Sequence, residues 1–82
     1  MKNKTRILIV EDDMIIAANI SLQLERLGYE VTGIVTRGEE ALLQTKENAP
    51  DILLLDINLK GALNGIQTAM EIHKHRDIPV IY

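Results

Sequence analysis

Two short, unbroken apolar runs constrain the fold of this chain more than any other feature of its sequence. Residues 7–10 (ILIV) and Ile52–Leu55 (ILLL) contain no polar side chain. A strand has this pattern when both of its faces are buried, because neither face then meets water. Such strands occur almost only in parallel sheets that helices cover on both sides. The two runs therefore predict an α/β fold built around a parallel sheet.

Helical periodicity follows the first run. Residues 14–27 are predicted to form a helix because large apolar side chains recur there at spacings of four, four and three. The side chains of this predicted core stripe are Ile16, Ile20, Leu24 and Leu27. Gly28 stands where a helix commonly ends in a left-handed conformation. Residues 29–35, which are rich in β-branched side chains, are predicted to form the next strand.

The next helix is delimited by signals at both of its ends. Thr36 and Glu39 have the spacing of a capping box, which predicts that a helix begins there. Pro50 disfavours the helical conformation at the residue before it, so we expect this helix to end near Asn48. The second apolar run, Ile52–Leu55, then forms the third predicted strand.

The last third of the chain continues the alternation. After a glycine-containing loop, residues 65–76 are predicted to form a helix, and residues 77–82 begin a fourth strand. The order βαβαβαβ predicts a doubly wound parallel sheet with right-handed crossovers and helices on both faces. The strand order expected for it is the flavodoxin-like order 2-1-3-4, in which ligands bind beyond the carboxyl ends of the strands.

Composition and charge restrict the class of protein further. At 82 residues, 46% hydrophobic and 26% charged, the chain has room for one domain of the soluble globular kind. A net charge of -3 without a basic stripe argues against direct binding to nucleic acid. The absence of cysteine excludes disulfides, zinc thiolate sites and thiol nucleophiles. No stretch resembles a signal peptide or a membrane span, so we expect a cytoplasmic protein without membrane contact.

Acidic residues follow two strands that are neighbours in the expected sheet. Glu11, Asp12 and Asp13 come directly after the first strand, and Asp56 ends the third. Carboxylates held together raise one another's pKa and oppose the folded state. Mg²⁺ would remove this conflict, because it prefers a few carboxylates plus waters and leaves room for phosphate oxygens. The spacing therefore predicts a carboxylate–magnesium pocket that can accept an anion.

Each acid also has a plain structural interpretation. Asp13 precedes the predicted helix, where an aspartate commonly caps the N-terminus, and we favour that role for it. Asp56 alone could simply begin a loop. For Glu11, Asp12 and Asp56 together, at two strand ends that meet at one switch point, we favour a functional site.

These residues stand within segments that resemble the receiver domain of two-component response regulators. The resemblance covers essentially the whole chain, and five short motifs occur in the right order and at the right spacing. The matching segments are residues 7–13 (ILIVEDD), 38–42 (GEEAL), 50–56 (PDILLLD), 64–66 (NGI) and 78–81 (IPVI).

The resemblance implies a role for each site residue. Asp56 is expected to be the phosphoacceptor, which attacks a phosphohistidine of a sensor histidine kinase or a phosphotransfer protein. Asp12 is expected to bind Mg²⁺ directly, Glu11 through water, and Asn58 through its backbone carbonyl. The chemistry is consistent, because a carboxylate nucleophile needs a metal to neutralise the charge of the transferring group. The implied protein is a signalling switch that acts on an output domain or partner, not an enzyme beyond weak self-dephosphorylation.

The chain departs from the family pattern in its third loop. Lys60 occupies the position where the family usually has proline, and the loop between Asp56 and Gly65 is one residue longer than the common form. Lys60 could approach the phosphoryl group or lie in solvent. We favour solvent, because lysine is rarely fixed or buried.

A second departure concerns the parts of the family fold that would follow Tyr82. By resemblance, residues 1–82 correspond to a receiver domain without its last strand, its last two helices, a phosphate-sensing Thr or Ser and a lysine. Such a chain is expected to be phosphorylated poorly and also to switch poorly. It is also expected to self-associate through its fourth strand or through its first helix, where Ile15, Ala18 and Leu22 form a second apolar stripe.

Other functions remain alternatives. A pseudo-receiver would bind proteins without taking phosphate, but it is expected to lack a residue of the acidic pocket. A phosphohydrolase that forms an aspartyl phosphate usually has a second aspartate where Asn58 stands. A flavin-binding protein of the same fold would have a Ser/Thr/Gly-rich loop after the first strand, where this chain has acids. His73 and His75, two positions apart on a helix, do not face each other and are expected to be ordinary surface residues.

Overall fold

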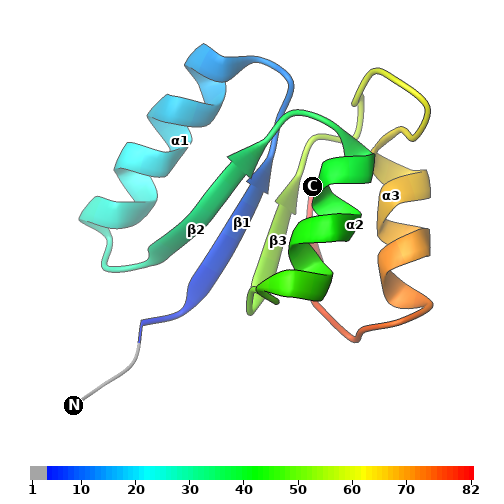
Figure 1. Cartoon of the computed structure of the whole chain (residues 1–82). Helices are drawn as coiled ribbons and strands as arrows, with labels where there is room; N and C mark the ends of the chain where they lie inside the picture. Colours follow the sequence, from blue (N-terminus) through cyan, green and yellow to red (C-terminus); the bar gives the residue numbers. More distant parts are fainter. Residues whose placement is uncertain (1–3) are drawn as a thin grey trace.

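Strands and helices alternate along the chain, as the apolar runs predict. The computed structural model describes residues 4–82. Four strands and three helices lie within this range (Figure 1). They are β1 (Arg6–Val10), α1 (Met14–Arg26), β2 (Glu30–Val35), α2 (Gly38–Glu47), β3 (Ile52–Leu55), α3 (Gly65–His73) and β4 (Val80–Ile81).

The four strands form one parallel sheet with the order β2-β1-β3-β4. This is the predicted doubly wound arrangement, and the order 2-1-3-4 is confirmed. The central strands β1 and β3 pair over four residues, and the last pair joins Val10 to Leu55. Residues 11 and 56 therefore leave the sheet side by side at its carboxyl edge.

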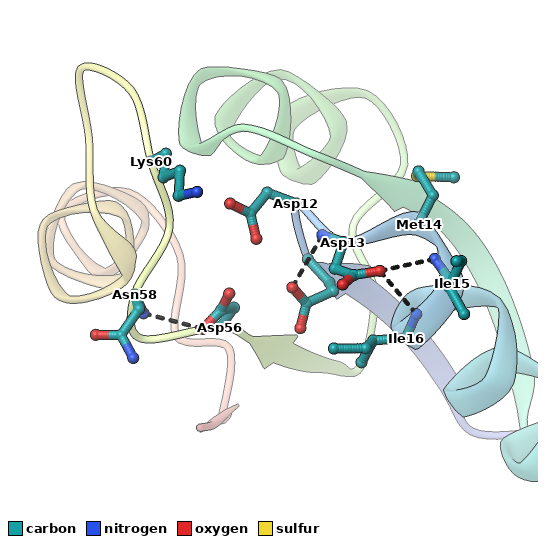
Figure 2. A pocket seen from close by; sticks show the side chains of 9 residues that line it. Asp12, Asp13, Met14, Ile15, Ile16, Asp56, Asn58 and Lys60 are labelled. Atoms are coloured by element: carbon teal, nitrogen blue, oxygen red, sulfur yellow. Dashed lines mark hydrogen bonds between the residues drawn. The ribbon is translucent and has the colours of Figure 1, made fainter.

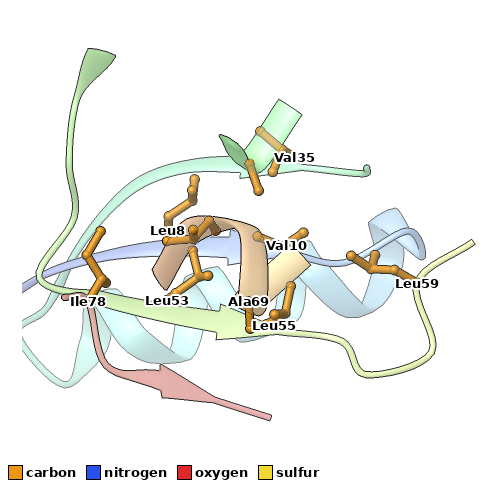
Figure 3. Packing of buried hydrophobic residues seen from close by; sticks show 10 residues of the cluster. Leu8, Val10, Val35, Leu53, Leu55, Leu59, Ala69 and Ile78 are labelled. Atoms are coloured by element: carbon orange, nitrogen blue, oxygen red, sulfur yellow. The ribbon is translucent and has the colours of Figure 1, made fainter. Parts of the chain in front are cut away.

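The helices lie on the two faces of the sheet, with α1 on one side and α2 and α3 on the other (Figure 1). The face under α2 and α3 holds the main hydrophobic core (Figure 3). Its ten buried residues are Leu8, Val10, Val35, Ala41, Leu53, Leu55, Leu59, Ala69, Ile72 and Ile78. Both apolar runs contribute to this core, because every second residue of a strand points to the same face.

The predicted core stripe of the first helix is partly wrong. Leu27 is 73% exposed and Ile16 is 47% exposed, whereas Ala17 is fully buried. Ile20 and Leu24 are half-buried, so the inward face runs through Ala17 and lies about one position round the helix from the predicted stripe. The helix contacts β1 and β2, and Ala17 is its one fully buried side chain. Ile15, Ala18 and Leu22 are exposed, as expected for the second stripe.

Two of the predicted helix ends are confirmed. The Asp13 carboxylate accepts hydrogen bonds from the backbone N–H groups of Ile15 and Ile16, at 3.0 and 3.2 Å, so Asp13 is the N-cap of α1. Gly28 has a φ of 97°, and the N–H groups of Gly28 and Tyr29 donate to carbonyls in the last turn of α1. This pattern is the left-handed helix end that Gly28 predicted.

The capping box predicted at Thr36 is wrong. The hydroxyl of Thr36 donates to the Glu40 carboxylate at 3.2 Å, and the N-cap residue is Arg37, which makes no side-chain cap. The helix begins at Gly38, which packs closely against α3 and the loop before it: a Cβ there would overlap the Thr68 hydroxyl of α3 and lie 2.9 Å from the Leu63 Cβ atom.

A complete capping box occurs instead at α3. The Asn64 side chain accepts from the Gln67 N–H, and the Gln67 side chain accepts from the Asn64 N–H. The helix ends at His73, three residues earlier than predicted. His73 is exposed, and its Nε2 lies 2.8 Å from the Ile78 carbonyl, so this histidine stabilises the turn into β4.

In the part of the chain that the structure describes, no helix has the length and apolar character needed to cross a bilayer.

Candidate functional site

Three of the predicted site residues converge at the carboxyl edge of the sheet. Glu11, Asp12 and Asp56 each place one carboxylate oxygen within 4.8 Å of those of the other two. All three side chains are half-buried. Figure 2 shows Asp12 and Asp56 facing a common space between the β1–α1 and β3–α3 loops. Residues 45 positions apart in the sequence thus form one acidic cluster, as the strand order predicted.

The backbone of the sheet sets the separation of these acids. The Asp56 N–H donates to the Val10 carbonyl at 2.9 Å, and the Glu11 N–H donates to the Val35 carbonyl at 3.0 Å. These bonds continue the parallel ladders one residue beyond the strands. Since ladder hydrogen bonds fix strand register, the two acidic segments are held together by main-chain geometry and not by attraction between their side chains.

The Asp56 carboxylate is oriented by its own loop. The Asn58 N–H donates to the Asp56 Oδ1 atom at 3.0 Å, which is the local turn that aspartates often form. Among the residues that the structure describes, no second donor reaches this carboxylate. One oxygen therefore fixes the direction of the side chain, and lone pairs remain available for another ligand.

Gly65 brings α3 against the backbone that carries Asp56. A Cβ at this position would lie 2.6 Å from the Ile57 Cα atom, and it would meet the Asp56 carbonyl oxygen still more closely. The Gly65 N–H also donates to the Ile57 carbonyl at 3.3 Å. Only a residue without a side chain allows this approach, because the opposing atoms are main chain and cannot rotate away.

The cluster carries an electrostatic cost. Partial burial raises the pKa of the Glu11 carboxyl above its ordinary value, and the nearby Asp12 and Asp56 carboxyls raise it further. The hydrogen bond from the Asp13 N–H to Glu11, at 3.1 Å, acts in the opposite direction. The ionised form of Glu11 is therefore disfavoured in the folded protein unless a positive charge is present.

The acids border an open pocket of about 750 Å³. Its lining residues are Glu11, Asp12, Asp13, Met14, Ile15, Ile16, Asp56, Asn58 and Lys60. Asp13 differs from the other acids because its carboxylate is already engaged by the N-terminus of α1. The structure thus separates one capping acid from the three clustered acids, as predicted.

The donor set fits a hard divalent cation. Three carboxylates supply oxygen ligands only, and Mg²⁺ prefers oxygen ligands with several positions left to water. Two oxygens bound to one Mg²⁺ lie at most about 4.2 Å apart, twice the Mg–O distance of about 2.1 Å. The oxygens here lie within 4.8 Å of one another, so small side-chain movements would bring them onto one ion. Glu11, Asp12 and Asp56 are the residues that could hold it.

Asn58 and Lys60 complete the rim on the side of the β3–α3 loop. Asn58, whose carbonyl was the fourth predicted ligand, lines the pocket and is exposed. Lys60 is exposed, as expected, and it also lines the pocket (Figure 2). Lys60 therefore contacts solvent and also lies beside the acids.

Several contributors to the site were not predicted from the sequence. Leu59 is only 4% exposed and belongs to the main core, although it stands in a loop between polar residues. The sequence motif 64–66 includes Gly65, but it does not predict the close packing of this glycine against the main chain of residues 56 and 57. The Asn64–Gln67 pair has the spacing of a capping box, and this signal could have located the start of α3.

Known proteins resemble the chain in both sequence and fold. The family model described as the response regulator receiver domain matches residues 7–82. The phyllosphere-induced regulator PhyR of Methylorubrum extorquens is 33% identical over 79 residues, which are 95% of this chain and 30% of that protein. The chain spans about a third of the length of the curated relatives it matches.

Solved structures are also similar. The signal receiver domain of a modulated diguanylate cyclase from Desulfovibrio desulfuricans G20 is 45% identical, with a TM-score of 0.88, over 93% of this chain and 61% of that chain. PhyR from Bartonella quintana, an anti-anti-sigma factor crystallised with the anti-sigma factor NepR, is 34% identical with a TM-score of 0.88. That match covers 96% of this chain and 33% of the PhyR chain.

The packing of Gly65 predicts a strong effect of a single methyl group. Gly65→Ala should destabilise the protein by about 1–3 kcal/mol, because a Cβ there overlaps main-chain atoms of residues 56 and 57. Gly33→Ala is the matched control, since its Cβ would have only an ordinary 3.7 Å contact with Leu8. Urea unfolding of both variants measures the difference. Equal stabilities of the two variants would contradict the close approach of α3.

The raised pKa of Glu11 predicts a pH-dependent stability difference between the wild type and Glu11→Gln. A raised folded-state pKa contributes stability below the unfolded-state pKa, and this contribution is lost as the pH rises through the folded-state value. Without divalent metal, the wild type should therefore lose stability relative to the variant as the pH rises above the ordinary glutamate value of 4.5.

At neutral pH, Glu11→Gln should melt roughly 1–4 °C higher than the wild type in EDTA, given solvent screening of a half-buried group. Saturating Mg²⁺ should stabilise the wild type more than the variant. Thermal melts at several pH values, with and without Mg²⁺, give both comparisons. A variant less stable than the wild type in EDTA at neutral pH would refute repulsion within the cluster.

Proposed function

The chain belongs to the response regulator receiver domain family, and from this premise we propose that it is a phosphorylation-dependent signalling switch with Asp56 as phosphoacceptor. The observation that carries the proposal is the convergence of Glu11, Asp12 and Asp56 at one edge of the sheet. A lone aspartate after a strand would not support it. Three half-buried carboxylates around an open pocket do, because they suit a cation and leave space for a phosphoryl group.

The proposed reaction is phosphoryl transfer from a phosphohistidine. A carboxylate oxygen of Asp56 attacks the phosphorus atom, a P–O bond forms, and the P–N bond to the imidazole breaks. The electron pair of that bond stays on the imidazole nitrogen. The imidazole leaves neutral when its other nitrogen carries a proton, and otherwise takes a proton from solvent. The product is an acyl phosphate on Asp56. The hydrogen bond from Asn58 to Oδ1 supports this role, because it fixes the direction of the nucleophile before the donor arrives.

Mg²⁺ is the cofactor proposed for this site. Glu11, Asp12, Asp56 and the backbone carbonyl of Asn58 would hold it, with Glu11 acting through water. When bound, the ion would neutralise the charge on the transferring phosphoryl oxygens. The acids themselves act before phosphoryl transfer. Their carboxylates repel one another, and this repulsion is relieved only when a positive charge is present.

The proposed partners are proteins. A sensor histidine kinase or a phosphotransfer protein would supply the phosphoryl group, and an output domain or a separate protein would respond to it. We assign residues 1–82 to the receiver domain and propose that it acts in the cytoplasm. The domain accepts a group and releases it slowly to water, so it is proposed as a switch and not as an enzyme with a turnover of its own.

A small-molecule donor gives the direct test. The protein incubated with Mg²⁺ and acetyl phosphate should gain the mass of one phosphoryl group, detected by intact mass spectrometry, and EDTA should abolish the gain. Asp56→Asn should show no gain, because an amide is not a nucleophile at neutral pH. Asp51→Asn is the matched control, since Asp51 lies at the opposite end of β3 and binds the Arg6 N–H.

The alternative is a pseudo-receiver that binds proteins without phosphate. It would be favoured if the wild type gains no mass under these conditions while it still folds and binds a partner. A mass gain in Asp56→Asn would instead place the acceptor elsewhere.

The surface opposite the main core supports self-association. β4 is an edge strand of the sheet, and its residue Ile81 and the following Tyr82 are 51% and 60% exposed. Apolar side chains line a further hollow of about 140 Å³ beside α1 on this side of the sheet: Ile7, Leu24, Tyr29, Ile52, Leu54 and Ile81. An edge strand with apolar side chains is a template for pairing with another chain. We propose that two copies of residues 1–82 pair through β4.

Sedimentation velocity tests the pairing of copies. The protein should show a concentration-dependent shift from monomer to dimer, and Ile81→Lys should move the equilibrium about tenfold or more toward monomer by placing charge on the edge. Ile15→Lys, on the exposed stripe of α1, is the control that separates the two surfaces. A wild type that stays monomeric at millimolar concentration would refute the proposal.

A further inference from the structure

One cation stands at the acidic pocket. Among the described residues that line it, Lys60 alone carries a positive charge. Figure 2 shows its ammonium directed toward the Asp12 carboxylate, across the space that Asp56 also faces. Lys60 also lines a neighbouring hollow of about 390 Å³ with Asp12, Thr36, Arg37 and Gly61. The side chain therefore lies where the β3–α3 loop meets the acids.

The backbone of Lys60 is held in this place by the residues on either side. Leu59 is buried in the main core with 4% exposure, which anchors the loop directly before the lysine. Gly61 has a φ of 108°, a conformation that turns the chain directly after it. A lysine between a buried anchor and a tight turn keeps its Cα near the pocket, while its long stem remains free to move.

The ammonium group is also uncommitted. Within residues 4–82, the two ion pairs join Arg6 to Glu30 and Lys74 to Glu71, and neither involves Lys60. No hydrogen bond of Lys60 occurs in the same range. Its three donors are therefore available to a ligand in the pocket.

The charge balance of the pocket indicates which kind of ligand the Lys60 ammonium would bind. The three clustered carboxylates carry three negative charges, and a divalent cation neutralises two of them. Lys60 supplies the third positive charge, so these three acids are balanced before an anion enters. The fourth carboxylate of the pocket, that of Asp13, is engaged by the N-terminus of α1. Without Lys60 the same pocket would stay negative and would repel a phosphoryl group.

We propose that Lys60 is a phosphoryl-binding residue, whose ammonium donates to an oxygen of the phosphoryl group on Asp56. This inference rests on the proposed function of Asp56 and adds a specific residue to it. The contact forms only when the phosphoryl group is present, so Lys60 favours the phosphorylated state over the metal-bound state. Towards the metal itself the lysine is unfavourable, because both are positive and both approach Asp12.

These opposite effects give the test. The variants are Lys60→Met, which keeps the length of the stem without its charge, and Lys60→Arg, which keeps the charge. Arg37→Gln is the matched control, since Arg37 lines the neighbouring hollow but not the pocket of Asp56. Mg²⁺ affinity is measured by calorimetry. Affinity for beryllium fluoride, a mimic of the phosphoryl group, is measured by ¹⁹F NMR at saturating Mg²⁺.

Lys60→Met should bind beryllium fluoride about tenfold more weakly, the scale of one lost charge-assisted hydrogen bond. It should bind Mg²⁺ as tightly as the wild type, or about twofold more tightly. Lys60→Arg should stay within about threefold of the wild type for both ligands, and Arg37→Gln should change neither by more than about twofold.

Three results would overturn the inference. Wild-type affinity of Lys60→Met for beryllium fluoride would show that the ammonium makes no contact. Equal losses in Lys60→Met and Arg37→Gln would show only a general effect of surface charge. Failure of the wild type itself to bind beryllium fluoride, or to gain mass from acetyl phosphate, would remove the proposed function and this inference with it. The first two results would leave the proposed function intact.

Discussion

The parallel ladder between β1 and β3 is the interaction on which the rest of the site depends. Its last pair joins Val10 to Leu55, and the hydrogen bond from Asp56 to Val10 carries the ladder one residue further. In β3 the fully buried Leu53 and Leu55 alternate with the half-buried Ile52 and Leu54, so a slip of one residue would exchange side chains between two differently packed faces. The hydrophobic core thereby fixes the register, and the register fixes the distance between acids that repel each other.

The same cluster gives a physical reason why a cation would bind at this edge of the sheet. The folded protein holds Glu11, Asp12 and Asp56 together at an electrostatic cost, which raises the pKa of Glu11. Any positive charge that binds there relieves repulsion, and its binding energy is available only in the folded state. Part of the stability gained from the core is thus lost to repulsion at one edge of the sheet, and a bound cation would restore it. As proposed, Lys60 would extend this charge balance from the cation to a phosphoryl group.

Prediction from sequence succeeded where one local signal decided the outcome. The two apolar runs identified the central strands, Asp13 and Gly28 identified the ends of α1, and the positions of Glu11, Asp12 and Asp56 predicted their convergence. It failed where tertiary packing competed with a local pattern. The capping box predicted at Thr36 does not form, and α2 begins at Gly38, which makes a close contact with α3. The inward face of α1 lies about one position round the helix from the predicted stripe, so that Ala17 meets the sheet. The extra residue of β2 at Thr32, where the pairing shifts between Ile7 and Leu8, was not predicted, although the neighbouring Gly33 is the kind of strand glycine that often marks a bulge.

The contact at Gly65 suggests how a change at Asp56 could reach the surface. Because the first residue of α3 touches the main chain of residues 56 and 57 directly, no layer of flexible side chains lies between Asp56 and the helix. A shift of the Asp56 backbone on gaining a phosphoryl group would therefore have to displace the N-terminus of α3 or be resisted by it. α3 packs in turn against α2, where Thr68 meets Gly38 just as closely. Two glycine contacts thus join the acidic edge to both helices of one face, and tightly packed elements of this kind move as bodies rather than deform.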